Sequence, residues 1–317
     1  MSGPMIHARV VAKSMKAPGI AAFVLASEGG EPLPVYSAGA HIDISLPNGM
    51  TRQYSLCGEK GDPTRYEIAV LRDGNGRGGS AFLHDSVRVG ELLKISQPRN
   101  LFPLVEACHS VLFAGGIGIT PLLAMARTLA ARSSSFELHY FVRSQDRAAF
   151  LDVLEHLVPA GALHLHVGDR IPPSFAVDQV LGAPSSGAHF YTCGPNPFMD
   201  ALLDLARARG WREAQLHSER FAAVVGGDER PFDIELASSG RIVPVLAGQT
   251  AAEALALSGI TLPMSCEQGI CGTCLTTVLS GLPDHRDSYL SDDERLANDC
   301  FTPCCSRALT PRLTLDL

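Results

Sequence analysis

The chain has 317 residues and a formal net charge of -7, and 46% of its residues are hydrophobic while 19% are charged. This length exceeds one ordinary hydrophobic core, so we expect three domains, and the composition excludes a disordered or fibrous protein. The negative charge is concentrated in residues 231–317, which carry 11 acidic and 5 basic side chains. Because contacts to phosphates need Lys and Arg, we expect no nucleic-acid partner.

No targeting segment or membrane span is expected. The first residues contain no apolar run of signal-peptide length, and the nine cysteines are placed unevenly, unlike a disulfide framework, which predicts a cytoplasmic location. Twenty residues between Glu106 and Arg127 carry no formal charge, a length near that of a membrane span. The glycines and the proline in this stretch favour a buried strand, a turn and a helix that begins at Thr120 and Pro121.

Short β-rich segments separated by NG, DG and GG turns fill the first hundred residues, a pattern typical of an antiparallel barrel or sandwich. The expected strands are 7–15, 20–27, 41–46, 52–58, 65–73 and 91–98. From residue 110 strands alternate with helices, which predicts a parallel sheet covered by helices. Its expected strands are 110–115, 136–144, 162–169, 188–194 and 214–221, and its expected helices are 120–133, 148–158 and 197–210.

A polar stretch at 226–230 predicts a linker before the last domain. A hairpin is predicted for residues 232–240 and 241–248. A helix is predicted to follow it, with a capping box of Thr250 and Glu253 at its start and Gly259 at its end. A second capping box, Ser291 with Glu294, begins a short helix before the last cysteines. The expected domains are therefore 1–105, 106–225 and 226–317.

Three cysteines cluster in the run SCEQGICGTC. Cys266, Cys271 and Cys274 have the spacing C-x4-C-x2-C, and 29 residues separate Cys274 from Cys304. This spacing is typical of a plant-type [2Fe-2S] centre with four thiolate ligands. The glycines of the run let the backbone wrap closely around bridging sulfides, which accept hydrogen bonds from backbone amides.

A structural zinc site is the alternative, with Cys271, Cys274, Cys300 and Cys304 as its ligands. That ligand set leaves Cys266 unused and does not explain the glycine-rich loop. Cys305 adjoins Cys304 and competes with it for the place of fourth ligand, although we expect Cys300 and Cys305 to be spectators. The eleven histidines do not fall at metal-ligand spacing along the sequence, so we expect solvated or core positions for them.

The runs MSCEQGICGTC, DHRDSYLSDDER and CCSRA resemble the ferredoxin domain of the phthalate dioxygenase reductase family, and the resemblance covers essentially the whole chain. It implies an FMN-binding antiparallel β-barrel in 1–105, an NAD-binding α/β domain in 106–225 and a [2Fe-2S] ferredoxin domain of the α+β, β-grasp class in 226–317. It also implies NADH as electron donor and a terminal Rieske-type oxygenase as partner in aromatic degradation.

The segment RQYSL is similar to the flavin motif R-x-Y-S/T of the ferredoxin reductase superfamily. Strand alternation puts Arg52 and Tyr54 on one face and Gln53 and Ser55 on the other, although an ordinary exposed strand has the same pattern. The run RDGNGRGGS reads as a hairpin loop or as a turn with Ser80 at a helix N-cap, which suits a phosphate; the residues alone leave FAD open. The flavin contacts implied by the resemblance are Arg52, Gln53, Tyr54, Ser55, Ala69, Val70, Leu71, Gly78, Gly79, Ser80, Thr120 and Phe221.

The segment AGGIGITP follows the first strand of the α/β half, where parallel strands place ligands. It lacks the third glycine of the Rossmann fingerprint but is similar to the superfamily's GGxGxTP loop, and YTCGP resembles the motif whose cysteine flanks the nicotinamide C4. Arg143 would also suit the 2′-phosphate of NADPH, whereas the resemblance favours NADH. The implied nicotinamide-binding residues are Gly115, Gly116, Gly118, Thr120, Pro121, Arg143, Ser144, Cys193, Gly194 and Pro195.

Together these motifs predict a reductase that takes a hydride from NADH and passes single electrons through a cluster to an oxygenase. Ser55 and Cys193 are expected to position and polarise the reacting groups. The acidic residues Asp292, Asp293 and Glu294 are a candidate docking face, although acidic residues also suit the start of a helix. The alternatives are a reductase for a ferredoxin or a diiron oxygenase, and a non-catalytic redox sensor, for which the chain shows no output module.

Overall fold

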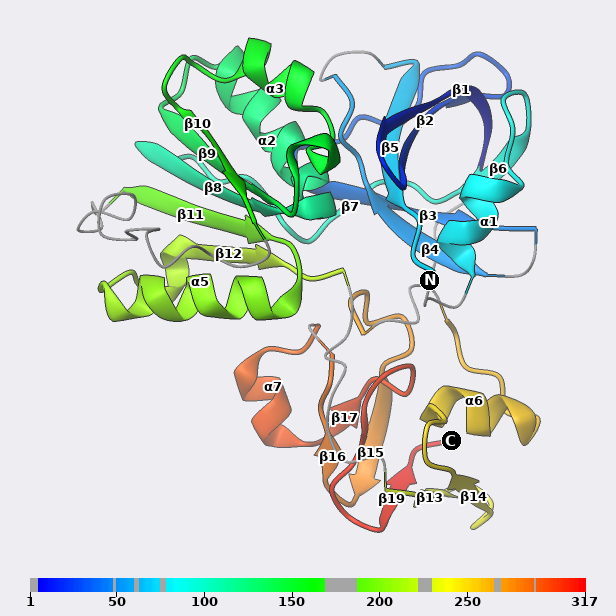
Figure 1. The fold of residues 1–317 in the computed structure, drawn as a ribbon. Coiled ribbons are helices and arrows are strands. Elements are labelled where there is room, and N and C mark those ends of the chain that lie inside the picture. Colours follow the sequence, from blue (N-terminus) through cyan, green and yellow to red (C-terminus); the bar gives the residue numbers. More distant parts are fainter. Residues whose placement is uncertain are drawn as a thin grey trace. The chain divides into compact units, whose positions relative to one another are not determined.

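The structure, a computed structural model, describes residues 5–47, 50–59, 63–74, 78–168, 187–221, 230–264, 269–287 and 289–317. It divides into two compact units, 1–219 and 220–317. The first unit holds both an antiparallel and a parallel sheet (Figure 1), so the domain boundary expected near residue 105 lies inside a compact unit, and the division into three domains stays a prediction. In the ranges described, no helix has the length and apolar character needed to cross a membrane.

The antiparallel sheet of the first unit curls into a barrel. Its order is β4-β3-β6-β1-β2-β5, with β7 paired to β3, and a bridge between Leu56 and Ile68 joins the end of β4 to β5. Alternating apolar side chains such as Phe23, Leu25 and Ile42 fill its interior. The elements are β1 (Ile6–Ala17), β2 (Ile20–Ser27), β3 (Ala40–Ser45), β4 (Thr51–Ser55), β5 (Arg65–Leu71), α1 (Gly79–Asp85), β6 (Leu92–Ile95) and β7 (Arg99–Asn100).

The parallel sheet of the first unit has the order β10-β9-β8-β11-β12. Helices α2 and α3 cover one face and α5 covers the other (Figure 1). The chain starts at central β8, moves outward to β10 and returns to β11 beside β8, a switch at which α/β sheets bind ligands. The elements are β8 (His109–Gly115), α2 (Ile119–Ala131), β9 (Phe136–Val142), α3 (Leu151–Leu157), β10 (Leu163–Val167), β11 (Ala188–Cys193), α5 (Asn196–Ala208) and β12 (Leu216–Glu219).

The second unit is built on a mixed sheet of order β14-β13-β19-β15-β17, in which β13 and β19 run parallel. Helix α6 packs its Ala251 and Leu255 into the sheet core with Phe232 and Leu313. β16 and β18 form a separate pair. The elements are β13 (Phe232–Leu236), β14 (Ile242–Val245), α6 (Ala251–Leu257), β15 (Thr276–Ser280), β16 (Pro283–Asp284), α7 (Asp292–Ala297), β17 (Cys300–Phe301), β18 (Arg307–Ala308) and β19 (Arg312–Leu315).

The expected hairpin of β13 with β14 is confirmed, as are the capping boxes at Thr250 and Ser291. The linker expected at 226–230 falls almost entirely outside the described residues. Two helix starts differ from expectation. Helix α2 begins at Ile119, and the N-cap of α1 is Gly78, whose φ of 90° suits glycine. Ser80 was wrongly expected there; it lies inside α1, where its hydroxyl accepts the backbone N–H of Asp73 at 3.1 Å.

Candidate active site and candidate metal centre

Two glycine-containing loops meet at the switch point of the parallel sheet. A Cβ on Gly118 would lie 2.1 Å from the carbonyl oxygen of Cys193, and one on Gly194 would lie 2.9 Å from the Cα of Gly115. The loop after β8 and the loop after β11 therefore pack backbone against backbone, which only glycine permits. Gly116 has a φ of 54°, and a Cβ there would meet none of the described atoms within 4 Å, so the space beside it is open.

The residues predicted to bind nicotinamide gather at the ends of three adjacent strands. Thr120 is buried in the first turn of α2, where its hydroxyl donates to the carbonyl of Ile117 at 3.1 Å. Pro195 is the N-cap of α5. Arg143 is exposed and Ser144 is half-buried directly after β9, the strand that flanks β8. The structure thus brings these residues to one edge of the sheet.

Ser55 of the barrel meets the parallel sheet at this edge. Its hydroxyl donates to Oε2 of Glu219 at 3.3 Å, and Glu219 is the in-register neighbour of Cys193 on the adjacent strand. All three residues are buried. The structure therefore joins the two predicted catalytic residues through a carboxyl group that the sequence analysis missed. The available signal was the position of Glu219 at the end of the last strand, in the run HSERF.

Burial sets the charge at this junction. It raises the pKa of Glu219 to about 8, although the hydrogen bond from Ser55 acts in the opposite direction. Burial, with Glu219 nearby, also raises the pKa of the Cys193 thiol well above its ordinary value. At neutral pH both groups are therefore largely protonated, and the junction is uncharged.

The predicted flavin motif and the predicted phosphate turn lie against each other. A Cβ on Gly79 would lie 2.7 Å from Nε of Arg52, whose Nη1 donates to the carbonyl of Thr51 at 2.7 Å. Gln53 instead faces Asp43, to which its amide donates at 2.8 Å. This arrangement supplies a cationic group and a tight glycine turn on one side of the barrel, as a phosphate requires.

The other predicted flavin residues are less tightly grouped. Tyr54 is half-buried against the barrel core. On β5, Ala69 and Val70 are buried while Leu71 is 39% exposed, and the Val70 carbonyl lies 2.8 Å from Nε2 of His84 in α1. Phe221 is half-buried and belongs to the second unit, so its contact with a flavin stays a prediction.

The second unit carries the cysteines of the predicted cluster, although Cys266 lies outside the described residues. Cys274 and Cys304 are both buried at 4% exposure, and Cys271 is half-buried. The Cys304 thiol, hydrogen-bonded to Cys274, lowers the pKa of Cys274. Two predicted ligands that are 30 positions apart in the sequence thus lie in contact, as ligands of one centre must.

The loop that carries these cysteines needs its glycines. Gly269 has a φ of 70°, and a Cβ there would lie 2.3 Å from Sγ of Cys305 and 2.9 Å from the Cα of Asp287. Gly272 has a φ of 67°, and its Cβ would lie 2.2 Å from the ring of Tyr289. The backbone at Gly269 and Gly272 therefore passes too close to its neighbours for any larger residue.

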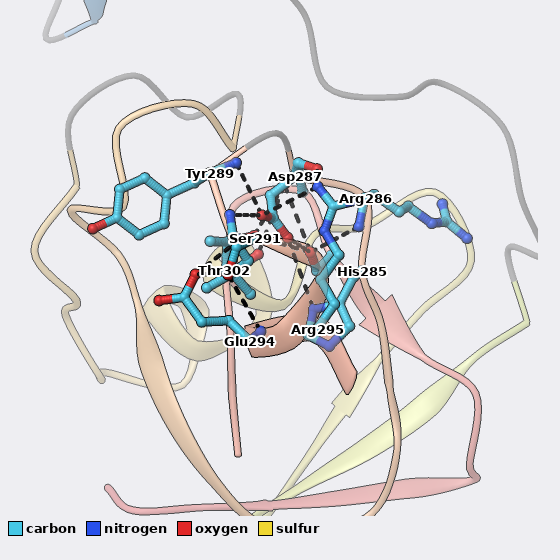
Figure 2. Close-up of polar contacts among 11 residues, drawn as sticks. His285, Arg286, Asp287, Tyr289, Ser291, Glu294, Arg295 and Thr302 are labelled. Atoms are coloured by element: carbon cyan, nitrogen blue, oxygen red, sulfur yellow. Dashed lines mark hydrogen bonds and ion pairs between the residues drawn. The ribbon is translucent and has the colours of Figure 1, made fainter. Parts of the chain in front are cut away.

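A buried carboxylate organises the segment on which this loop rests (Figure 2). Oδ2 of Asp287 accepts the backbone N–H groups of Tyr289 at 3.1 Å and Leu290 at 2.8 Å, and Oδ1 accepts the hydroxyl of Ser306 at 3.3 Å. Arg295 of α7 donates to the Asp287 carbonyl at 2.6 Å. Asp287 therefore links the turn under the cluster loop to α7 and to the segment that follows Cys304.

Comparison with known proteins decides the family. Residues 234–309 match the 2Fe-2S iron-sulfur cluster binding domain family. The vanillate O-demethylase oxidoreductase of Pseudomonas putida is 49% identical over 99% of this chain and 100% of its own length. The phthalate 4,5-dioxygenase oxygenase reductase subunit of the same organism is 40% identical over 98% of this chain and 96% of its own. The chain belongs to the phthalate dioxygenase reductase family.

A solved member of this family shares the whole fold. Phthalate dioxygenase reductase, described as a modular structure for electron transfer from pyridine nucleotides to [2Fe-2S], is 37% identical and superposes with a TM-score of 0.81 over 99% of this chain and 98% of its own. The fold expected from the sequence is therefore confirmed, as is the [2Fe-2S] domain. Which residues of this chain hold the cluster, the flavin and the nicotinamide stays a prediction.

Proposed function

We propose that the chain is the cytoplasmic reductase component of a Rieske-type oxygenase system, which moves electrons from NADH through FMN and a [2Fe-2S] cluster to the oxygenase. The observation that carries the proposal is the contact of Ser55 with Glu219, the in-register neighbour of Cys193, on a chain that also holds a [2Fe-2S] domain. One chain thus provides both the site for a hydride acceptor and the domain for a one-electron carrier.

The bound flavin supplies the step from two-electron to one-electron chemistry. The residues of the chain bind and orient. The glycines of the loop after β8 admit the nicotinamide, and Arg52 with Gly78 and Gly79 receives the flavin phosphate. Glu219 holds the Ser55 hydroxyl in place, and the buried Cys193 thiol keeps water away from the reacting faces.

Four thiolates hold the cluster in this proposal, namely those of Cys266, Cys271, Cys274 and Cys304. The contact of Cys274 with Cys304 and the glycine-dependent loop support the assignment. Cys300 and Cys305 are spectators in this proposal.

The family supports an oxygenase as the partner. Relatives are named for vanillate O-demethylation and for phthalate 4,5-dioxygenation, which supports a partner that acts on a small aromatic acid. The N-terminal turn of α7 is the proposed docking face for a locally basic partner surface, with Asp293, Glu294 and also Asp292, whose side chain lies outside the described part of the structure. Electron transfer to the oxygenase that does not weaken with rising ionic strength would exclude this docking face.

Anaerobic stopped-flow mixing with NADH and with NADPH tests the proposal. We expect NADH to bleach the flavin faster than NADPH, cytochrome c to be reduced afterwards, and extraction to yield FMN with iron and acid-labile sulfide. In Cys193→Ala we expect slower flavin reduction while both chromophores stay bound. A flavin that NADH does not reduce would favour the redox sensor, and FAD in the extract would correct the flavin assignment.

A further inference from the structure

A second group of metal-ligating side chains lies on the face of the parallel sheet that α5 covers. Glu137 and His139 are two residues apart on β9 and therefore point to the same face. On the neighbouring edge strand β10, His164 pairs in register with His139. The three residues meet only through the pairing of two strands, so no metal-ligand spacing appears in the sequence. His139 lies in a core position and His164 in a partly solvated one, as expected.

The three ligand atoms converge on one point. Oε2 of Glu137 lies 3.7 Å from Nε2 of His139 and 3.9 Å from Nε2 of His164, and all three atoms lie within 4.8 Å of one another. Ligands that share a tetrahedral zinc ion at about 2.0–2.2 Å are separated by roughly 3.3–3.6 Å. Small side-chain movements are therefore enough to close the group around an ion.

The neighbours of His139 suit a histidine that binds a metal ion. His139 is 1% exposed, and its Nδ1 lies 3.0 Å from Nε2 of His166. A proton on Nδ1 that is donated to His166 would direct the lone pair of Nε2 toward Glu137, which is the usual outer-shell support for a histidine ligand.

One ring must move before an ion can bind. The rings of His139 and His164 are stacked, with centroids 4.4 Å apart and planes at 8°, and an ion cannot lie in the planes of two stacked rings. His164 is 38% exposed and belongs to the edge strand, so its ring is able to turn toward the ion. His109, whose Nε2 lies 3.7 Å from Oε1 of Glu137, is placed to supply a further ligand.

We propose that Glu137, His139 and His164 form a binding site for one divalent transition-metal ion of the Zn²⁺ class, a use that the reductase function does not require. Two imidazoles and a carboxylate are ligands that such ions prefer. The site lies toward the start of β9 and β10, whereas the nicotinamide residues lie at the opposite ends of the strands. The ion therefore cross-links the edge strand to its neighbour and takes no part in hydride transfer.

Zinc binding to the holoprotein tests the site. Protein with flavin and cluster intact is stripped of loosely bound metal and titrated with Zn²⁺ against a coloured competing chelator. We expect one ion per chain, binding at least about 100-fold weaker in His164→Ala, and about 10-fold weaker in Glu137→Gln and in His166→Ala. His156→Ala, at an exposed histidine of α3, and Cys108→Ser, at an exposed thiol, should bind as the wild type does.

X-ray absorption at the zinc edge identifies the ligands without interference from the iron of the cluster. We expect nitrogen and oxygen ligands with imidazole scattering, one imidazole fewer in His164→Ala, and unchanged flavin and cluster absorbance in every variant. Sulfur scattering, equal affinity in wild type and His164→Ala, or no saturable binding would each overturn the proposal. The His164 side chain is 38% exposed, and a melting temperature of His164→Ala equal to that of the wild type shows that a loss of binding reports the site itself.

Discussion

The junction of the first unit and the cysteine loop of the second unit are built in opposite ways. The junction joins Ser55 to Glu219, 164 positions away in the sequence, and depends on how two sheets pack. The cysteine loop takes three predicted ligands from nine consecutive residues, 266–274, and depends on local backbone shape. A site whose residues come from one loop is recognisable from their spacing in the sequence. A site whose residues come from different sheets has no such spacing.

The largest effect is expected where the cysteine loop meets its distant ligand. Replacing Cys304 by Ser should abolish the [2Fe-2S] centre, because a cluster with three thiolates loses its iron, while flavin reduction by NADH continues. Assays of iron and acid-labile sulfide measure the loss. Cys300→Ser is the matched control and should keep a full cluster. The reverse pattern would show that the fourth ligand has been assigned to the wrong cysteine.

The buried carboxyl group of the junction should make stability depend on pH. Because the pKa of Glu219 is raised to about 8 in the folded chain, the folded state holds its proton more tightly than the unfolded chain, so this contribution is complete below about pH 4.5 and is lost as the pH rises toward 8. Glu219→Gln should remove a stability difference on the order of 3 kcal/mol between acidic and alkaline pH.

Melting curves of the wild type and of Glu219→Gln at pH 5.5 and 8.5 measure this difference. Glu213→Gln, on the same segment but with a pKa lowered by its hydrogen bond to Arg207, is the control and should keep the pH dependence of the wild type. If the melting temperature changed equally between pH 5.5 and 8.5 in the wild type and in Glu219→Gln, Glu219 would already be ionised at neutral pH.

Two glycines of the loop after β8 differ in what a methyl group would meet. Gly118→Ala would force a Cβ against the Cys193 carbonyl and should destabilise the first unit by about 2–3 kcal/mol. Gly116→Ala faces open space and should cost about 1–2 kcal/mol through its positive φ, while it raises the KM for NADH. Urea unfolding and steady-state kinetics separate the two effects. Equal losses of stability would contradict the backbone contact.

A smaller effect is expected at the carboxylate beneath the cysteine loop. Asp287→Asn keeps the size of the side chain but weakens charge-assisted hydrogen bonds to two backbone amides, and should destabilise the second unit by about 1–3 kcal/mol. Loss of cluster colour in urea measures the change. Asp233→Asn removes only a surface ion pair with Arg312 at 3.5 Å and should change little. Equal urea midpoints for Asp287→Asn and the wild type would mean that Asp287 does not hold the cysteine loop in place.

The sequence predicted local features well. The alternating strands, the two capping boxes and the cysteine spacing each depend on residues within a few positions of one another, and the hairpin of β13 with β14 follows the same logic. Strands β15 and β19 were missed although Thr276–Ser280 and Arg312–Leu315 are rich in β-branched and leucine residues. Their short, half-exposed patterns carry little signal before their partners in the sheet are known.

The features that the sequence could not supply depend on register between distant segments. Glu219 faces Cys193 only because β12 pairs with β11, and His164 meets His139 only because β10 pairs with β9. Gly78 replaces Ser80 as the N-cap of α1 because the turn needs a left-handed residue at that point. In the first two cases a tertiary constraint decides which residues meet, and in the third the local backbone conformation decides the N-cap.

The central claim is that NADH reduces an iron-sulfur centre held by the same chain. Electron paramagnetic resonance of the holoprotein, frozen after anaerobic mixing with NADH, tests this most directly. We expect the signal of a reduced [2Fe-2S] cluster that approaches one spin per chain after excess NADH, and a slower appearance of that signal in Cys193→Ala. A protein that contains iron and sulfide in full but stays silent after its flavin has been reduced would contradict it.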